Sequence, residues 1–446
     1  MRKFMVLILS LMIMLGTSSN EVFAATVAGV LNNSSDTVSI LTPPNGLVPA
    51  KGDGTDETEV IQAIFDYATA AKKTILIPKD YTFVIDRLYI GDKDHFSILG
   101  YGTLKHNDGA TRSMIKIQNC SDFTIDTLTT DGNVVGNETD GNRINEGLDS
   151  TQIVESHDFK INNINDTNPA GDSLYLNDDN NVTIGTITAN ADVPSGRNAL
   201  SIIKAQNVTV DNVISQNIGY PTMPGGIDLE PNHATDNIQN VIIKAATIRT
   251  SGTNGCAVGN HALATVKDIN INANITKSGS PNGTGFVLNH VDNFKGNIMC
   301  NQEGTVPGYG SVITSCNYVD ADLEIYNSIT GLDVGKNSSN INLKGKIIGT
   351  TKNGIEIYDG LDQGVIDMEI KQVGQETSPD GAGGVIRISS GVADNLTFKG
   401  DYSFDKSGGY CFNIETPLTN CQTEDLNMSG WSEENKVTGV NALNLI

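Results

Sequence analysis

A short phrase recurs along most of this 446-residue chain and limits the folds that the chain can adopt. The phrase starts with a polar residue, usually Asn or Asp, continues with an apolar residue and ends two residues later, usually on Ile, Val or Leu. Clear copies start at His95, Asp122, Asp158, Asn181, Asn207 and Asn240, and weaker copies at Asp268, Asn293, Asn340, Gly364 and Asn395. The early intervals of 23 to 36 residues each hold one polar turn and two or three strand-length runs. A unit of this size cannot bury its apolar side alone, so the repeats predict a solenoid of stacked coils.

The composition agrees with a β-rich solenoid that contains little helix. The chain has 46 Gly and only 6% aromatic residues, which favours many tight turns over large aromatic cores. A solenoid grows by adding coils, so we expect residues 51–446 to form one domain although the length alone suggests about three. Residues 25–50, which include Pro43-Pro44, are expected to form an irregular lead-in.

The first 24 residues have the features of a secretory signal peptide. A basic start at Arg2-Lys3 is followed by a short apolar run to Gly16 and by small residues at Ala24-Ala25. No later run approaches the roughly 18 apolar residues that a membrane span needs. We therefore expect a secreted, extracellular protein that has no membrane contact after signal cleavage.

One amphipathic helix is predicted near the start of the domain. Asp56 as N-cap with Glu59 three residues later is typical of a capping box, and the helix should run to about Ala71. Its apolar face is predicted to consist of Val60, Ile61, Ile64, Phe65 and Ala68. Such a helix can cover the open apolar end of the first coil. Strands are predicted next at residues 74–77 and 82–85.

The net charge limits the classes of partner that the chain can bind, and the cysteine content limits the metal sites and disulfides that it can form. The net charge of -23 disfavours binding to nucleic acid or to anionic membranes, but it does not exclude an anionic sugar polymer. The six cysteines show no metal-site spacing. Cys300 with Cys316, and Cys411 with Cys421, could form local disulfides, whereas Cys120 and Cys256 are expected inside the solenoid as small apolar residues.

A second strand in each coil can be aligned by its pairs of apolar residues, from Leu174/Leu176 to Ile386/Ile388. Since side chains alternate along a strand, the residue between the two apolar residues of each pair should point outward. Equivalent outward residues in successive coils should be one strand spacing, about 4.8 Å, apart. The outward column reads Tyr175, Ser201, Asp228, Ala257, Val287, Asp333, Glu356 and Arg387. The neighbouring outward column reads Asn177, Ile203, Glu230, Gly259 and Asn289.

Several segments resemble the pectate-lyase-like superfamily of parallel β-helix proteins. They are Gly52-Asp53-Gly54-Thr55-Asp56 with its helix, Ile75-Leu76-Ile77-Pro78, Leu99-Gly100-Tyr101-Gly102, residues 196–202 and residues 226–232. The resemblance covers about residues 50–430. It implies an all-β, right-handed parallel β-helix of about 11–12 coils with an N-terminal capping α-helix. The superfamily contains lyases, hydrolases, epimerases and noncatalytic spikes. The resemblance therefore implies action on a polysaccharide, but it does not indicate which reaction the protein catalyses.

The densest chemical signal is Gly225-Gly226-Ile227-Asp228-Leu229-Glu230-Pro231-Asn232-His233. Asp228 and Glu230 lie on one face of a strand with Cα atoms about 6.5 to 7 Å apart, a spacing compatible with the acid and base of a glycosidase. The simpler alternative is a solvated acidic pair or a structural cation site. The predicted catalytic residues are Asp228, Glu230, Arg197 and His261; Arg197 is also suited to holding a carboxylate or sulfate.

Polar residues in the adjoining coils are predicted to bind the sugar. They are Asp172, Tyr175, Asn177, Asn198, Asn232, His233, Asn260, Asn289 and His290. The alternative for each histidine is a plain turn residue. Asp131, Asn133, Glu146, Asp149 and Glu155 are expected to form one wall of the same groove, whereas Asp333, Glu356 and Arg387 are expected to be solvated.

The predicted function is a secreted enzyme that degrades a polysaccharide bound along the parallel-sheet groove. The catalytic phrases of polygalacturonase-type hydrolases are only echoed at residues 165–168 and 259–261, so their residue roles are not carried over. Hydrolysis, which requires no cofactor, is favoured because paired acids are evident. The alternatives are a lyase or epimerase that acts on a uronic-acid polymer, for which Ca²⁺ is a candidate cofactor if the reaction is elimination, and a noncatalytic glycan-binding surface protein. The ligands of any metal are unknown.

Overall fold

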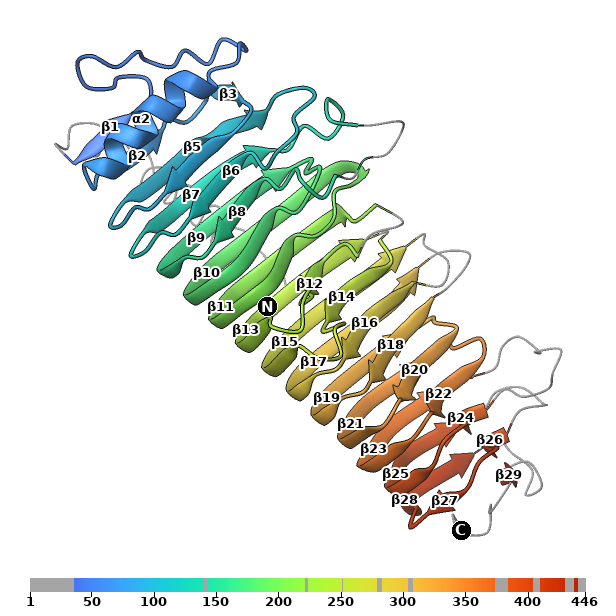
Figure 1. The fold of residues 1–446 in the computed structure, drawn as a ribbon. Coiled ribbons are helices and arrows are strands. Elements are labelled where there is room, and N and C mark those ends of the chain that lie inside the picture. The colour runs from blue at the N-terminus through green and yellow to red at the C-terminus, as the bar shows by residue number, and fades with distance from the viewer. Residues whose placement is uncertain are drawn as a thin grey trace, which may run out of the picture.

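The computed structural model describes residues 36–138, 143, 145–220, 224–250, 252–278, 283–303, 308–373, 384–403, 410–429 and 437–439. The chain winds into a right-handed parallel β-helix of about 12 turns, which confirms the predicted architecture (Figure 1). Residues 1–24, predicted as a signal peptide, lie outside the described residues. No helix in the described part of the chain is long and apolar enough to cross a membrane.

Most turns of the solenoid contain one short and one long strand, and each pairs in parallel with its counterpart in the next turn. The short strands are β4 (Leu88–Gly91), β6 (Ile115–Gln118), β8 (Thr151–Val154), β12 (Ile227–Leu229), β14 (Asn254–Val258), β16 (Thr284–Asn289), β18 (Tyr309–Thr314), β20 (Thr330–Gly335), β22 (Asn353–Tyr358), β24 (Gly384–Ile388), β26 (Tyr410–Ile414) and β29 (Val437–Gly439). The long strands are β5 (Ser97–His106), β7 (Thr124–Asp131), β9 (His157–Thr167), β13 (Asn237–Thr250), β15 (Thr265–Ser278), β17 (Asp292–Glu303), β19 (Asn317–Tyr326), β21 (Ser338–Ile348), β23 (Leu361–Lys371), β25 (Ala393–Ser403), and the last turn's β27 (Leu418–Thr419) and β28 (Gln422–Ser429).

Two strands run through both positions of their turn. They are β10 (Leu174–Ser195) and β11 (Leu200–Ile218), and their first residues pair with β8 and β12. We call the sheet formed by the short strands and by the starts of β10 and β11 the short-strand sheet. Figure 1 shows its members in a row along the whole solenoid.

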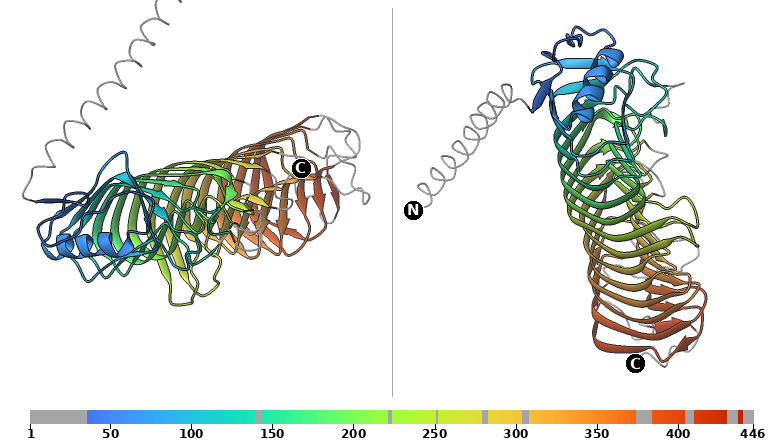
Figure 2. Two further views of the ribbon diagram at one scale, coloured as in Figure 1. Left: turned by 90° about the horizontal axis from the view of Figure 1, so that it is seen from above. Right: turned by 60° about the vertical axis from the view of Figure 1, so that its left-hand side comes forward.

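The N-terminal end is covered by the helix α2 (Thr58–Ala70), close to the predicted bounds (Figure 2). Its buried residues include Ile61, Ile64 and Phe65, and it packs against β2 (Thr74–Ile77), β4 and β1 (Thr37–Ser39). The strand β1 falls within the segment expected to be irregular. Strand β3 (Thr82–Ile85) follows β2 as predicted.

The predicted capping box is wrong in detail. The N-cap residue is Glu57 rather than Asp56, and no side chain caps the helix from that position. The Glu57 carboxylate instead accepts hydrogen bonds from the backbone N–H groups of Lys51 and Gly52. Asp56 still helps the first turn, because its Oδ1 accepts from the backbone N–H of Thr58 at 2.9 Å.

The recurring phrase marks one corner of each coil. Its first residue has a left-handed backbone, with φ from 52° to 56° at Asp122, Asp158, Asn181 and Asn207. Asn and Asp tolerate this conformation better than most residues. The corner side chains also join neighbouring coils, since Asn207 Nδ2 donates to Asn181 Oδ1 at 3.1 Å and Asn240 Nδ2 donates to Asn207 Oδ1 at 2.8 Å.

The next residue of the phrase enters the core. Phe96, Phe123 and Phe159 stack with ring centroids 5.0 and 4.7 Å apart. One corner is occupied by Tyr318, whose φ is 56°, and the phrase therefore has no recognisable copy between Asn293 and Asn340. The structure thus contains a coil that the sequence repeat does not show.

All six cysteines are buried, and none of them forms a disulfide. This confirms the interior position predicted for Cys120 and Cys256, and it contradicts the two local disulfides suggested for the other four. Cys256, Cys300 and Cys411 lie on β14, β17 and β26, whereas the other three cysteines lie in turns between strands.

The register of the short-strand sheet confirms the predicted outward column and adds one member. Tyr175, Ser201, Asp228, Ala257 and Val287 are successive partners. Val312 then lies between Val287 and Asp333, in the coil that has Tyr318 at its corner. The second column is corrected at one position: a bulge pairs Asn177 with Lys204, so Ile203 is not the partner of Asn177.

Candidate functional site

A polar cluster lies on the outward face of the short-strand sheet, where the starts of β10 and β11 meet β12. Gln152, Tyr175, Ser201 and Asp228 are opposite one another in successive coils. The neighbours of Asp228 along β12, Ile227 and Leu229, are fully buried in the core. Asp228 therefore faces away from the core, although neighbouring groups leave only 3% of it exposed.

The turn before each strand contributes a ladder of side chains. The backbone N–H of Asp172 donates to Asp149 Oδ1 at 3.1 Å, that of Asn198 to Asp172 Oδ1 at 3.0 Å, and that of Gly225 to Asn198 Oδ1 at 2.8 Å. Asp172 and Asn198, both predicted to bind substrate, therefore also hold the turn of the following coil. Asp172 keeps its Oδ2 buried and without a hydrogen-bond partner.

Asp149 belongs to this cluster, whereas the sequence suggested only a groove wall. It stands two residues before its strand, the same position that Asp172 and Asn198 occupy in their coils. Burial, followed by the charge of Asp172, raises the pKa of Asp149 well above its usual value. Burial also raises the pKa of Asp172. The shared position relative to the strand was the signal that could have identified Asp149.

Arg197 is the cation at the centre of these acids. Its Nη1 lies 3.8 Å from Asp172 Oδ2, and its buried Nε has no hydrogen-bond partner. Burial alone would lower the pKa of Arg197, but the charges of Asp172, Glu146 and Asp228 outweigh burial and raise the pKa. Arg197 therefore stays positively charged.

Asp228 and Glu230 lie together as predicted. Burial raises the pKa of Asp228 well above its usual value, and the charges of Glu230 and Asp172 raise it further. A side-chain hydrogen bond with Glu230 also favours the protonated form of Asp228. Glu230 is only half-buried, and its Oε1 accepts a hydrogen bond from Asn260 Nδ2 at 2.6 Å. The pair thus combines one buried carboxyl group with one more accessible carboxyl group.

Tyr175 lies over the same acids. Burial, then the charges of Asp149 and Asp172, raise the pKa of its phenol to about 12. A hydrogen bond with Asn177 partly opposes this shift. At neutral pH the Tyr175 hydroxyl therefore remains a hydrogen-bond donor for a ligand.

The histidines occupy turn positions next to this cluster. His261 Nδ1 accepts a hydrogen bond from the backbone N–H of Leu263 at 3.3 Å, and the backbone N–H groups of Asn232 and His233 donate to Asp236 Oδ2. Burial, then the charges of Lys336 and His261, lower the pKa of His290. Among the described residues, His261 forms no hydrogen bond or ion pair with Asp228 or Glu230. Its catalytic role therefore stays a prediction.

The remaining predicted residues divide between the site and other contacts. Asn289 Oδ1 accepts a hydrogen bond from Thr314 Oγ1 at 3.0 Å, beside His290. Glu146 acts on the charge of Arg197. By contrast, Asp131 Oδ1 accepts from the backbone N–H of Asn133, and Glu155 accepts from Gln118 Nε2. Of the expected wall residues, Glu146 and Asp149 are therefore the two that interact with Arg197.

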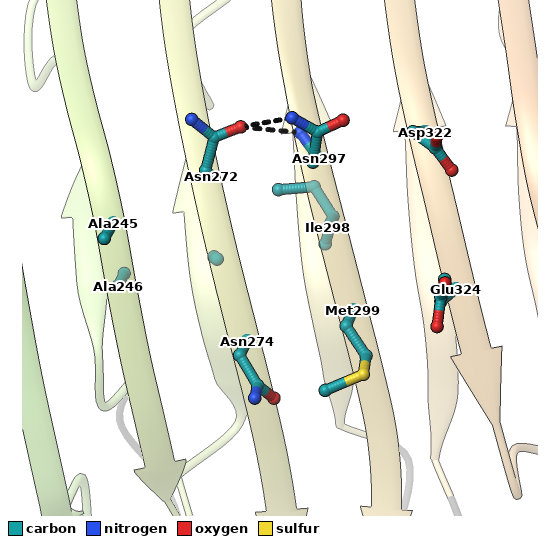
Figure 3. Close-up of a pocket in the computed structure, with 10 residues that line it drawn as sticks. Ala245, Ala246, Asn272, Asn274, Asn297, Ile298, Met299, Asp322 and Glu324 are labelled. Carbon is teal, nitrogen blue, oxygen red and sulfur yellow. Dashed lines mark hydrogen bonds between the residues drawn. The ribbon is translucent and has the colours of Figure 1, made fainter.

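A shallow pocket of about 460 Å³ lies elsewhere, on the long strands β13, β15, β17 and β19 (Figure 3). Small side chains such as Ala246 and Ala273 leave this space open, and Asn297 Nδ2 donates to Asn272 Oδ1 across it. Its acids are already paired: Asp322 with Lys344 at 3.7 Å and Glu324 with Lys346 at 3.0 Å. The pocket therefore has no free carboxyl pair comparable to Asp228 and Glu230.

No three His, Cys, Asp or Glu side chains among the described residues converge to hold a metal ion. The Ca²⁺ suggested for the lyase alternative stays a prediction.

Comparisons with known proteins identify the fold. No protein-family model and no curated protein sequence matches this chain. Among solved structures, the pre-mature form of bacteriophage phi29 gene product 12 is similar with a TM-score of 0.51 and 14% identity over 93% of this chain. This chain spans 60% of the length of that phage protein.

Two enzymes of known structure are also similar. They are a DFA-IIIase from Arthrobacter chlorophenolicus, with a TM-score of 0.44 and 11% identity over 91% of this chain and 97% of the other, and an exopolygalacturonase from Thermotoga maritima, with 0.40 and 11% over 89% and 93%. The strand pairing of the chain itself defines the fold as a right-handed parallel β-helix. At these identities the likeness concerns the fold alone.

Proposed function

We propose that this protein hydrolyses glycosidic bonds of a polysaccharide that lies along the outward face of the short-strand sheet. The observation that carries the proposal is the pairing of Asp228, whose pKa is raised by burial and by Glu230, with the more accessible Glu230. Glycoside hydrolysis needs one carboxylic acid to protonate the leaving oxygen and one carboxylate to act as base or nucleophile. Asp228 is suited to the first role and Glu230 to the second.

The surrounding charges favour a neutral sugar. Asp172, Glu146, Asp228 and Asp149 are four carboxyl groups whose charges act on the guanidinium of Arg197. A polymer of uronic acids would bring further negative charge into this field, which costs free energy in a partly desolvated site. Neutral sugar hydroxyls instead can donate to the carboxylates and accept from Arg197 and Tyr175.

The same charges bear on the lyase alternative. Elimination from a uronic-acid chain needs a base that removes a proton from the sugar. Arg197, one of the predicted catalytic residues, would have to lose its own proton to act as this base, and the acids around it raise its pKa, which makes it a weaker proton acceptor. We therefore assign Arg197 to binding and charge stabilisation rather than to proton abstraction.

The test is a panel of neutral, uronic and sulfated polysaccharides incubated with the purified protein. Reducing ends report hydrolysis, and ultraviolet absorbance of an unsaturated product reports elimination. We expect new reducing ends from a neutral polymer without that absorbance. Absorbance that rises with product would support the lyase instead, and retention of a polysaccharide without product would support the noncatalytic glycan-binding protein.

Substitutions at Asp228 and Glu230 test whether these two residues catalyse the reaction. Asp228→Asn and Glu230→Gln should each abolish most turnover while the protein stays folded. Asp211→Asn is a matched control, because Asp211 is an exposed acid on the strand β11. Its Oδ1 lies 2.7 Å from Lys244 Nζ, with which it forms an ion pair. Full turnover by both Asp228→Asn and Glu230→Gln would disprove this active pair.

A further inference from the structure

A second group of polar side chains lies further along the same outward column. Asp333 on β20, Glu356 on β22, Arg387 on β24 and Asn413 on β26 are successive register partners. Figure 1 shows these strands side by side in the C-terminal part of the short-strand sheet. Between this group and Asp228 the column contains only Ala257, Val287 and Val312.

These side chains are not simply solvated, as the sequence suggested. Arg387 Nη1 lies 3.5 Å from Glu356 Oε1, and their side chains are 21% and 19% exposed. Asn353 Nδ2 donates to Glu356 Oε2 at 3.0 Å. Arg387 also binds both carboxylate oxygens of Glu415, through Nε at 3.0 Å and Nη2 at 3.2 Å. Glu356 is therefore held in place from two sides.

Asp333 differs from its neighbour because the fold gives it no such support. Its Oδ1 is buried and has no hydrogen-bond partner. Burial, then the charge of Glu356, raise the pKa of Asp333 to about 7, against a smaller opposing effect of Lys352. A buried polar atom without a partner destabilises the fold. Such an atom next to a fixed carboxylate indicates a place where a ligand supplies the missing hydrogen bond.

Two tyrosines complete the group. Tyr309 and Tyr358 are both half-buried, and burial followed by the charge of Asp333 raises the pKa of each phenol. Their rings provide apolar surface and their hydroxyls provide hydrogen bonds, the combination found in sites for amphipathic ligands. The group therefore offers both kinds of contact that a sugar ring needs.

We propose that Asp333, Glu356, Tyr309, Tyr358 and Arg387 form a second saccharide-binding site, which holds a distant part of the same glycan chain. The inference rests on the proposed function, because it assumes that a glycan lies along this sheet. Four strand spacings separate Asp228 from Asp333, or about 19 Å. The intervening Ala257, Val287 and Val312 form a low apolar floor on which an extended chain can lie. The ligand is a neutral, hydroxyl-rich sugar segment.

The test compares binding and turnover in Asp333→Asn, Glu356→Gln and the matched control Asp367→Asn/Glu369→Gln. The control acids lie on the long strand β23, and Glu369 pairs with Lys371. Affinity for each polysaccharide is measured by its retardation of the protein in gels, and KM by reducing ends. We expect about a tenfold loss of affinity and a similar rise in KM with a polymer, because each variant weakens one hydrogen bond to the sugar and tenfold corresponds to about 1.4 kcal/mol. The loss should be smaller with an oligosaccharide too short to span about 19 Å.

Every outcome distinguishes this inference from the proposed function. Unchanged affinity and KM in both variants would overturn the second site while the hydrolase stands. A fall in kcat with KM unchanged would overturn it in favour of a catalytic role. Binding without turnover, weakened by Glu356→Gln, would support the second site and reject the hydrolase. A wild-type protein that neither binds nor cuts any polysaccharide would overturn both.

Discussion

The two polar groups of the short-strand sheet are built from similar residues but are supported differently. Around Asp172 the acids take part in the fold, because Asp149 and Asp172 each accept a backbone hydrogen bond from the next coil. Around Asp333 the acids hold no turn, and the Oδ1 atom of Asp333 has no partner. The comparison teaches that burial of a carboxyl group on this sheet has two origins. One stabilises the stack of coils, and we propose that the other serves to bind a ligand.

The largest expected difference between the two groups is in turnover. Asp228→Asn removes the proposed proton donor and should lower kcat about 100-fold to 10,000-fold, the usual contribution of acid–base catalysis. Asp333→Asn should act mainly on KM. Steady-state kinetics on one polymer measure both effects. Equal losses of kcat in the two variants would abolish the distinction between the groups.

The second difference is in folding stability. Asp172→Ala leaves the backbone N–H and Nδ2 of Asn198 without the acceptor that they use at 3.0 and 3.1 Å. A buried donor that loses its acceptor costs about 1–3 kcal/mol, so the free energy of unfolding should fall by that amount. Asp172→Asn keeps an oxygen acceptor and serves as the control. Urea titration of both variants gives the comparison, and equal stability of Asp172→Ala and wild type would contradict the structural role.

The third difference is in the pH dependence of stability. The pKa of Asp333 is about 7 in the fold and near 3.9 when unfolded, so the unfolded chain loses this proton first as pH rises. Asp333 therefore lowers stability progressively from about pH 4 to about pH 7 and fully above that. Asp333→Asn should raise the melting temperature at pH 8 and leave it nearly unchanged at pH 4. The Asp333→Asn variant leaves the facing titratable groups unchanged; they are Glu356, Lys352, Tyr309 and Tyr358.

An exposed corner should give the smallest effect. Asn207 has a φ of 56° and donates to Asn181, so Asn207→Ala should cost about 1 kcal/mol through the left-handed backbone. Asn207→Gly loses the same side chain but adopts this backbone freely, and it should cost less. Thermal melting of the pair separates backbone strain from the side-chain ladder. A larger loss for the glycine variant would show that the ladder dominates.

Much of the fold could be predicted because its signals are local. The corner phrase reports a left-handed residue followed by a buried one, and alternation along a strand reports which side chains face outward. Both follow from backbone geometry within a few residues. The prediction failed where a residue met the same requirement without matching the phrase. Tyr318 takes the left-handed corner, and its coil with Val312 was therefore missed.

The candidate site could be predicted in part. Asp228 and Glu230 share a strand, so their proximity follows from sequence separation. Asp149 is near Arg197 only because the coils stack, and 47 residues separate these two in the chain. The bulge at Asn177 and Lys204 and the absence of disulfides among the six cysteines likewise depend on which coils meet.

The sequence by itself determined that this chain is a solenoid of stacked coils whose strands turn alternate side chains outward, because those properties repeat within single coils. Only the tertiary structure decided which carboxyl groups are buried, which of them accept hydrogen bonds from a neighbouring coil, and which are left without a partner. The physical reason is that burial and hydrogen bonding on this sheet are properties of three adjacent coils at once. Residues that are about 4.8 Å apart across a strand spacing are separated in the chain by the whole length of a turn.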